Sequence, residues 1–180
     1  MLARLLLAAA LSLAALPAAA QDYVAGVDRD PAYNIGPGTD LVMAYFGSTT
    51  CFACQQPAFK AAAERAKVLL AEHAAAEGKT FVALGVSLDP GVAAGLEFIA
   101  SAGAFDEVAV GRNWFNSAAL AHLFRPEGLD ERPLSQPSII VFERDMVMGE
   151  TIAVGAVRYR FEIAGGDAIP AWVAAGAPLD

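Results

Sequence analysis

The chain has 180 residues, of which 12 are Lys or Arg and 20 are Asp or Glu, so its formal net charge at pH 7 is −8. This acidic balance argues against nucleic acids and anionic membrane surfaces as partners, because both attract basic proteins. The length is sufficient for one domain with its own hydrophobic core. We therefore expect a globular protein with no nucleic-acid partner.

The N-terminal segment has the pattern of a secretory signal peptide. Arg4 precedes an apolar run over residues 5–16, and the small residues 18–20 follow it. The run is shorter than the roughly 20 residues that a membrane-spanning helix needs, and an A-x-A ending is typical of a cleavage site. We predict a signal peptide over residues 1–20, a periplasmic or secreted location, and no stable membrane anchor after cleavage; a retained anchor is the alternative.

A lead-in segment and the first strand of the predicted domain come next. Residues 21–40 are rich in Gly, Pro and Asp, and the domain is expected over residues 41–180. The apolar residues 41–46 indicate a buried strand, and a polar break separates them from Cys51-Phe-Ala-Cys54. Residues 54–77 show the apolar spacing of a helix. The two cysteines are thus predicted to lie at the beginning of that helix.

A CxxC pair at the beginning of a helix is typical of redox chemistry. Free amide groups and the helix dipole favour a thiolate there, and Cys54 is close enough to Cys51 to close a disulfide. A purely structural disulfide would close a very short loop and restrain little of the unfolded chain. Structural zinc needs about four ligands, and His73 and His122 lack the spacing to complete the set. We expect neither a metal nor a cofactor.

The middle of the chain alternates strands and helices. We predict a strand buried on both faces, a helix, a short strand and a further helix over residues 80–88, 92–102, 108–110 and 116–124, respectively. Trp114 and Phe115 are expected to be core anchors. His73 lies on the apolar face of its helix, and His122 is given no role.

The last third predicts a hairpin followed by a helix. A charged loop over residues 125–134 precedes Gln136 and Pro137, a strand follows over residues 138–142, and a hairpin turn is expected at residues 143–145. The returning strand spans residues 146–154, where Gly155-Ala156 ends the strand or marks a bulge, and Asp167 is a candidate cap for a helix over 168–175. This order predicts an α/β fold with a mixed central sheet and helices on both faces.

From about residue 41 to residue 175 the chain resembles the thioredoxin-fold family. The CxxC follows the first core strand, and Pro137 stands before a strand where the family has its cis-proline. A hairpin follows, and Val154-Gly155-Ala156 is similar to the Val-Gly-Ala that precedes the family's last helix. The enlarged middle segment, residues 90–134, and the signal peptide resemble the exported, TlpA-like branch.

The resemblance implies an exported thiol–disulfide oxidoreductase. Cys51 would attack the substrate and Cys54 would resolve the mixed disulfide, while Gln136 and Pro137 would hold the substrate backbone. Its partners would be protein thiols or disulfides and a redox partner protein. Two departures leave the direction of electron flow open: Tyr45 replaces the family's buried acid, which helps to move protons, and the residues between the cysteines are Phe-Ala. Thr50 also replaces the family's Trp.

Three other functions compete with this one. Thiolates select copper(I), so a copper(I) metallochaperone is an alternative, although no Met- or His-rich tract accompanies the cysteines. A redox-inactive thioredoxin-like module that binds or assembles partners is a second alternative. A peroxidase would need an arginine near Cys51, for which Arg112 and Arg125 are the candidates, but no peroxidase motif is present.

Overall fold

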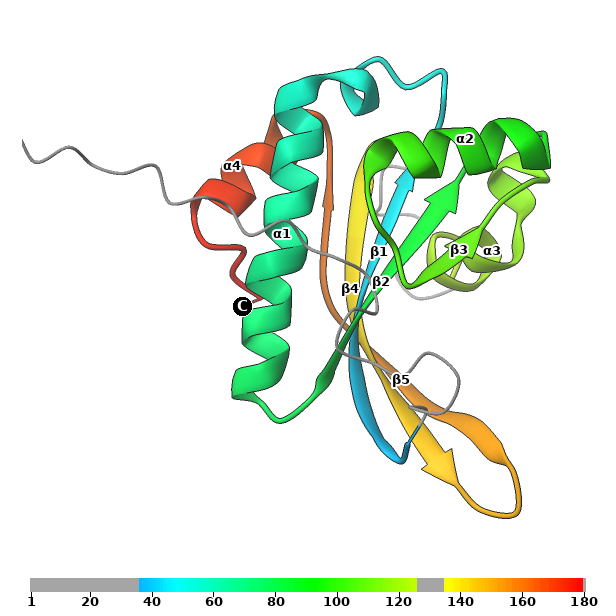
Figure 1. Cartoon of the computed structure of the whole chain (residues 1–180), viewed down its shortest axis with the longest axis vertical. Coiled ribbons are helices and arrows are strands. Elements are labelled where there is room, and N and C mark those ends of the chain that lie inside the picture. The colour runs from blue at the N-terminus through cyan, green and yellow to red at the C-terminus, as the bar shows by residue number, and fades with distance from the viewer. Residues whose placement is uncertain (1–35, 126–134, 180) are drawn as a thin grey trace, which may run out of the picture.

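A five-stranded mixed sheet lies at the centre of the structure, a computed structural model that describes residues 36–125 and 135–179 (Figure 1). The strand order is β3-β2-β1-β4-β5. The predicted signal peptide, most of the lead-in segment and most of the charged loop over residues 125–134 lie outside the described residues. The strands are β1 (Gly38–Gly47), β2 (Thr80–Ser87), β3 (Glu107–Ala109), β4 (Ser138–Met148) and β5 (Ile152–Ala164).

Strand β1 is the middle strand, paired in parallel with β2 and antiparallel with β4. Its apolar residues are buried on both faces, as expected for a strand with helices on either side. Met43 and Tyr45 join the core beneath helices α1, α2 and α4, whereas Ala44 and Phe46 join the core beneath α3. The predicted α/β fold with helices on both faces of a mixed sheet is confirmed.

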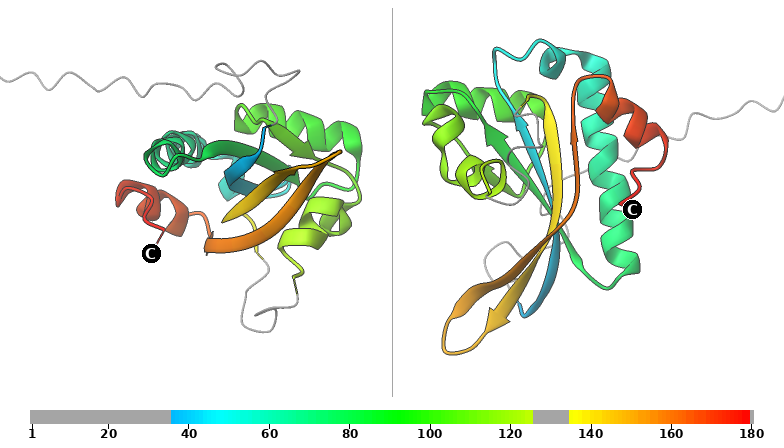
Figure 2. Two further views of the ribbon diagram at one scale, coloured as in Figure 1. Left: turned by 90° about the horizontal axis from the view of Figure 1, so that it is seen from below. Right: turned by 180° about the vertical axis from the view of Figure 1, so that it is seen from behind.

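The helices divide unequally between the two faces of the sheet. Figure 2 shows α1 and α4 side by side on one side of the sheet and α3 on the other. The helices are α1 (Pro57–Ala76), α2 (Val92–Ala102), α3 (Ser117–His122) and α4 (Ala168–Ala174), with 3₁₀ turns η1 (Ala53–Gln55) and η2 (Asn113–Phe115). Asn116 caps α3 by accepting a hydrogen bond from the backbone N–H of Ala119 at 2.9 Å.

The prediction of one continuous helix from residue 54 is wrong at its beginning. Cys54 lies in η1, Gln56 has an extended backbone with ψ 130°, and α1 begins at Pro57. Proline disfavours a helical conformation in the residue before it but fits the first position of a helix. Pro57 therefore separates η1, which contains Cys54, from α1. The cysteines do not form the first turn of the long helix.

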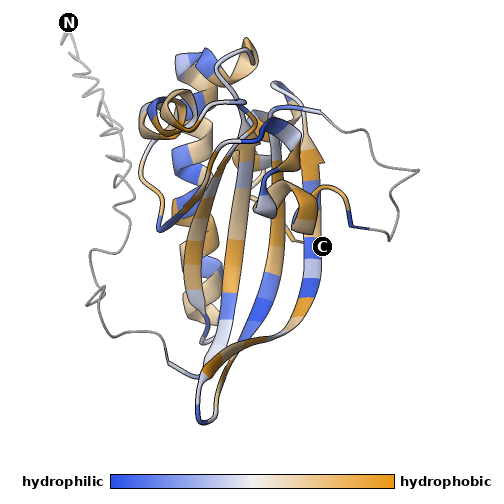
Figure 3. Cartoon of the chain, turned by 90° about the vertical axis from the view of Figure 1, so that its right-hand side faces the viewer, coloured by the Kyte–Doolittle hydropathy of each residue, from blue (hydrophilic) through white to orange (hydrophobic). Residues whose placement is uncertain are grey.

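The hairpin of β4 and β5 is longer than predicted. The predicted turn at residues 143–145 is wrong, because β4 continues to Met148 and the chain reverses over residues 149–151. The two strands extend beyond the helices in Figure 1, and in Figure 3 hydrophilic and hydrophobic bands follow one another along them. Gly155 and Ala156 lie at a register shift, which confirms the predicted bulge. They do not directly precede α4, so the likeness to the family's Val-Gly-Ala before its last helix is wrong.

Two smaller predictions about side chains have different outcomes. Trp114 is partly buried against the core beneath α3, as expected. Phe115 is 59% exposed and stacks on Phe124 at 6.1 Å between ring centroids, so the prediction that it anchors the core is wrong. Asp167 is the residue before α4, but its side chain makes no capping hydrogen bond.

Candidate functional site

Cys51 and Cys54 form a disulfide at the end of β1. Their sulfur atoms are 2.03 Å apart and their Cα atoms 5.3 Å apart. The Cys51 N–H donates to the carbonyl of Ser48 at 3.1 Å, which makes residues 48–51 a tight turn between the strand and η1. The sequence prediction that the two sulfurs are close enough to bond is therefore confirmed.

Asp89, which follows strand β2, holds the turn at residues 48–51 in place. Strands β1 and β2 are parallel, so the segments that follow them meet at the same edge of the sheet. The buried Asp89 carboxylate accepts hydrogen bonds from the Thr49 N–H at 3.1 Å, from the Thr49 hydroxyl, and from the Ser87 hydroxyl at 2.8 Å. The cysteine turn is thus held to both parallel strands.

The two sulfurs have different surroundings. Cys51 is 5% exposed and Cys54 is fully buried, so Cys51 is the more accessible of the two to a partner. The Cys54 N–H donates to Cys51 Sγ at 3.1 Å. A donor aimed at sulfur stabilises the anionic form of that sulfur more than the neutral one. In the reduced protein this arrangement favours Cys51 as the nucleophilic thiolate and Cys54 as the buried thiol.

Gln136 and Pro137 lie at the same edge of the sheet as the cysteines. The register pairs Phe46 with Ser138, so Pro137 stands beside Gly47, where the cysteine turn begins. The Gln136–Pro137 peptide bond is cis, as the resemblance of Pro137 to a cis-proline implies. Pro137 is buried, its carbonyl accepts from the Gly165 N–H at 2.8 Å, and Gln136 Oε1 is buried without a hydrogen-bond partner among the described residues.

The side of the disulfide that faces the core is aromatic. The Tyr45 ring lies among Phe59, Phe98 and Phe105, with centroid distances of 6.0, 6.1 and 6.1 Å. Burial raises the pKa of the Tyr45 hydroxyl above its usual value of about 10. In the sequence, Tyr45 is notable only because it stands where the thioredoxin-fold family has a buried acid. The alternation of side chains along β1, which places Tyr45 and Gly47 on one face, is the signal that could have identified it.

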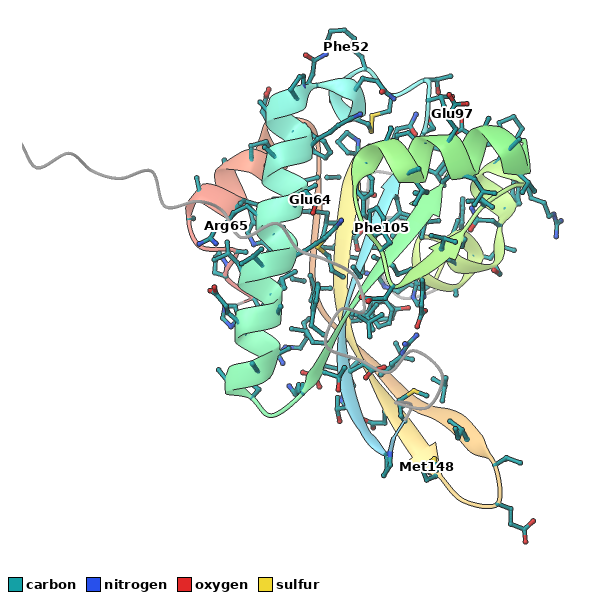
Figure 4. All side chains as sticks on the ribbon, viewed as in Figure 1. Phe52, Glu64, Arg65, Glu97, Phe105 and Met148 are labelled. Carbon is teal, nitrogen blue, oxygen red and sulfur yellow. A yellow bond between two sulfur atoms is a disulfide. The ribbon has the colours of Figure 1, made fainter. Side chains whose placement is uncertain are left out.

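Phe52, between the cysteines, is the most exposed large apolar side chain of the described residues, at 81%. Figure 4 shows it pointing away from the body of the protein, next to the yellow bond of the disulfide. The site thus has an apolar, solvent-facing side chain outside and an aromatic cluster inside.

Neither histidine contributes to this site. His122 stacks on Phe142 at 4.3 Å and shares a hydrogen bond of 3.0 Å with the Tyr159 hydroxyl, in the core beneath α3. His73 is partly buried in the last turn of α1. Across residues 36–125 and 135–179, no group of three or more His, Cys, Asp or Glu side chains is placed to hold a metal ion. Arg125, one peroxidase candidate, pairs with Glu162 at 2.6 Å.

Comparisons with known proteins leave the functional argument to the geometry. No family model, curated protein or solved structure matches the chain. None of the described helices has the length and apolar composition to cross a membrane.

Proposed function

We propose that this chain is an exported thiol–disulfide oxidoreductase of the thioredoxin-fold family, which exchanges disulfides with protein substrates through Cys51 and Cys54. One observation carries the proposal: a CxxC disulfide follows the central strand of an α/β sheet, with its outer sulfur hydrogen-bonded by a backbone N–H and its inner sulfur buried. This arrangement supports different chemical roles for the two cysteines.

The topology supports the family assignment. A parallel β-α-β unit, β1-α1-β2, is followed by an antiparallel hairpin and a terminal helix, and β1 lies between β2 and β4. The cis-proline before β4 lies beside the end of β1. Helices α2 and α3 and strand β3 belong to the enlarged middle segment, and β3 extends the sheet beyond β2.

The exchange needs no group beyond the two sulfurs. In the reducing direction, the Cys51 thiolate attacks a substrate disulfide, forms a mixed disulfide and releases one substrate thiolate. The Cys54 thiolate then attacks Cys51 Sγ and releases the second substrate thiolate. The substrate gains two electrons, and the Cys51–Cys54 bond forms again. A redox partner protein reduces that bond; the same steps reversed oxidise a substrate.

Gln136 and Pro137 are the proposed substrate-binding residues. Pro137 has no N–H and its carbonyl is occupied by Gly165, so it cannot pair with a further strand. The main-chain groups of Gln136, at the same edge as Cys51, are the proposed contacts for an extended substrate segment.

The test is disulfide exchange by single-cysteine variants. Cys51→Ser is expected to abolish reduction of insulin or of a peptide disulfide, because it removes the attacking sulfur. Cys54→Ser is expected to accumulate mixed disulfides that non-reducing gels resolve. Arg65→Gln, an exposed position on α1, is the control and should keep full activity.

Unchanged turnover by Cys51→Ser would overturn the proposal. Stoichiometric copper(I) binding by the reduced protein, with no exchange activity, would favour the metallochaperone alternative. Retained biological function in a Cys51→Ala, Cys54→Ala double variant would favour the redox-inactive binding module.

A further inference from the structure

The Tyr45 hydroxyl and the sulfur of Cys54 face the same small space at Gly47. A Cβ atom placed on Gly47 would lie 2.7 Å from the hydroxyl oxygen and 3.0 Å from Cys54 Sγ. The distance between the Tyr45 hydroxyl oxygen and Cys54 Sγ therefore cannot exceed the sum of these two distances. Tyr45 is 1% exposed and Cys54 is fully buried, so water does not separate them freely.

This hydroxyl has no hydrogen-bond partner among the described residues. Its ring is surrounded by phenylalanines, in which a Phe side chain would pack equally well. A buried hydroxyl that lacks a partner is unfavourable. The oxidised protein therefore retains an unpaired polar atom close to one of the two sulfurs of the disulfide.

We propose that the Tyr45 hydroxyl donates a hydrogen bond to the Cys54 thiolate at the steps of exchange in which that thiolate leaves the disulfide or attacks the mixed disulfide. The proposal rests on the proposed function, of which it names a further participating residue. Opening of the disulfide frees the Cys54 side chain to rotate and converts its sulfur into a strong acceptor. The hydroxyl then gains a partner that it lacks in the oxidised protein.

The proposed hydrogen bond acts on the leaving group. When a substrate thiolate attacks Cys51 Sγ, the Cys51–Cys54 bond breaks and its electron pair leaves on Cys54 Sγ. A second substrate thiolate then attacks the substrate sulfur of the mixed disulfide, and Cys51 leaves as a thiolate. The substrate loses two electrons and the cysteine pair gains them. Tyr45 stabilises the buried anion formed in the first step, and in the reverse direction it stabilises the same anion as the attacking group.

The hydroxyl acts as a donor and not as a base. Its raised pKa keeps it protonated at any physiological pH, whereas a buried carboxylate could also take up a proton. Tyr45 therefore stabilises the charge of the thiolate and does not take up its proton.

The test is the reduction potential of the Cys51–Cys54 pair in Tyr45→Phe. The hydroxyl favours only the reduced state, so its removal should make the potential more negative. We expect the equilibrium constant with glutathione to change about tenfold, which is about 30 mV for a two-electron couple. In a Cys51→Ala background, Tyr45→Phe should also raise the pKa of the Cys54 thiol, followed by thiolate absorbance.

Tyr159→Phe is the matched control. It also removes a tyrosine hydroxyl, but from β5, where Tyr159 is 36% exposed and its hydroxyl donates to the carbonyl of Ala121 on the face of the sheet covered by α3. Its potential should equal that of the wild type. If Tyr45→Phe folds poorly, Tyr45→Leu, which also lacks the hydroxyl, should shift the potential in the same direction.

The outcomes separate this inference from the proposed function. An unchanged potential and an unchanged Cys54 pKa in Tyr45→Phe would overturn the role of Tyr45, even with full exchange activity in the wild type. A shifted potential in a protein without any exchange activity would keep the hydrogen bond and overturn the oxidoreductase function.

Discussion

Gly47 is the residue on which the packing of the cysteine site depends most directly. Its hydrogen atoms face Phe98, the Tyr45 hydroxyl and Cys54 Sγ, and a Cβ would lie 2.7, 2.7 and 3.0 Å from these groups. The position needs Gly for space, since its φ is not in the left-handed region. Strand β1 must therefore end in a residue without a side chain for the disulfide to lie against the aromatic cluster.

Gly47→Ala is expected to destabilise the oxidised protein by about 1–3 kcal/mol, the usual cost of overpacking a filled core. Urea unfolding monitored by circular dichroism measures the loss. Gly36→Ala is the control, because a Cβ there meets nothing within 4 Å, and its stability should equal that of the wild type. Equal stability of Gly47→Ala and Gly36→Ala would contradict the close approach at Gly47.

At the level of elements, an ion-pair cluster holds the β4–β5 hairpin to the connection between α1 and β2. Glu143 of β4 accepts hydrogen bonds from Lys79 at 2.8 Å, from Arg158 at 3.2 Å and from Arg160. The hydrogen bond from Lys79 is the largest cause that lowers the pKa of Glu143 to about 2. The hydrogen bonds from Arg160 and Arg158 lower this pKa further, and burial opposes them. This carboxylate is the point where three elements meet.

Glu143→Gln is expected to destabilise the protein by about 1–2 kcal/mol at pH 7. This estimate lies between the usual cost of breaking an exposed ion pair and that of breaking a buried one. Because the folded pKa is lowered, the carboxylate contributes its full stability above the unfolded pKa of about 4.3 and loses it as the pH falls toward 2. Chemical unfolding at pH 7 and pH 2.5 measures both effects.

The difference between the Glu143→Gln variant and the wild type should shrink in acid. Glu72→Gln, at an exposed position on α1, serves as the control and should match the wild type at both pH values. A loss of stability in Glu143→Gln that is the same at both pH values would contradict the electrostatic origin of the effect.

The same cluster explains why the sequence predicted the hairpin turn in the wrong place. Glu143, Arg144 and Asp145 are three consecutive charged residues, which are typical of a turn. In the structure Arg144 donates to Asp40 at 3.0 Å, and Arg158 donates to Asp145 at 2.8 Å. These partners are far away in the sequence, so no local pattern could reveal that the charges are paired within a strand.

Local signals were sufficient for most other elements. Continuous apolar runs predicted β1 and β2, since burial on both faces leaves no alternation. The cysteine spacing predicted the disulfide. The cis peptide bond was implied by the resemblance of Pro137 to the thioredoxin-fold family's cis-proline, and not by a local pattern. The proposed role of the Tyr45 hydroxyl depends on its packing against Gly47 and Phe98. The alternation along β1 places Tyr45 and Gly47 on one face, but Phe98 comes from α2, and its contact with them has no local signature in the sequence.

At the scale of the whole molecule, His122 makes the folded state sensitive to mild acid. Burial against Phe142 is the largest cause that lowers its pKa to about 4, and the charges of Arg125 and Arg144 lower it further; Glu107 opposes them. The unfolded chain, in which histidine has a pKa of about 6.5, therefore binds the proton first. The stability that neutral His122 contributes is fully present above about pH 6.5 and is lost as the pH falls to about 4.

The free energy of unfolding should fall between pH 6.5 and pH 4 with a slope of up to about 1.4 kcal/mol per pH unit, the value for one proton. His122→Gln keeps a polar group near Tyr159 and should remove this slope. His73→Gln, on α1, is the control and should keep it. A slope that persists unchanged in His122→Gln would show that another group binds the proton.

The central place of β1 has a consequence for how the protein opens. This strand is bonded to a neighbouring strand along each side, whereas β3 and β5 are the two outer strands of the sheet that the described residues form, and the hairpin tip extends beyond the helices. Backbone amides exchange with deuterium most slowly where opening requires the loss of most of the fold. We therefore expect the peptide that leads into the cysteines to belong to the last part of the protein to unfold, so the proposed disulfide exchange would take place on a backbone that stays folded.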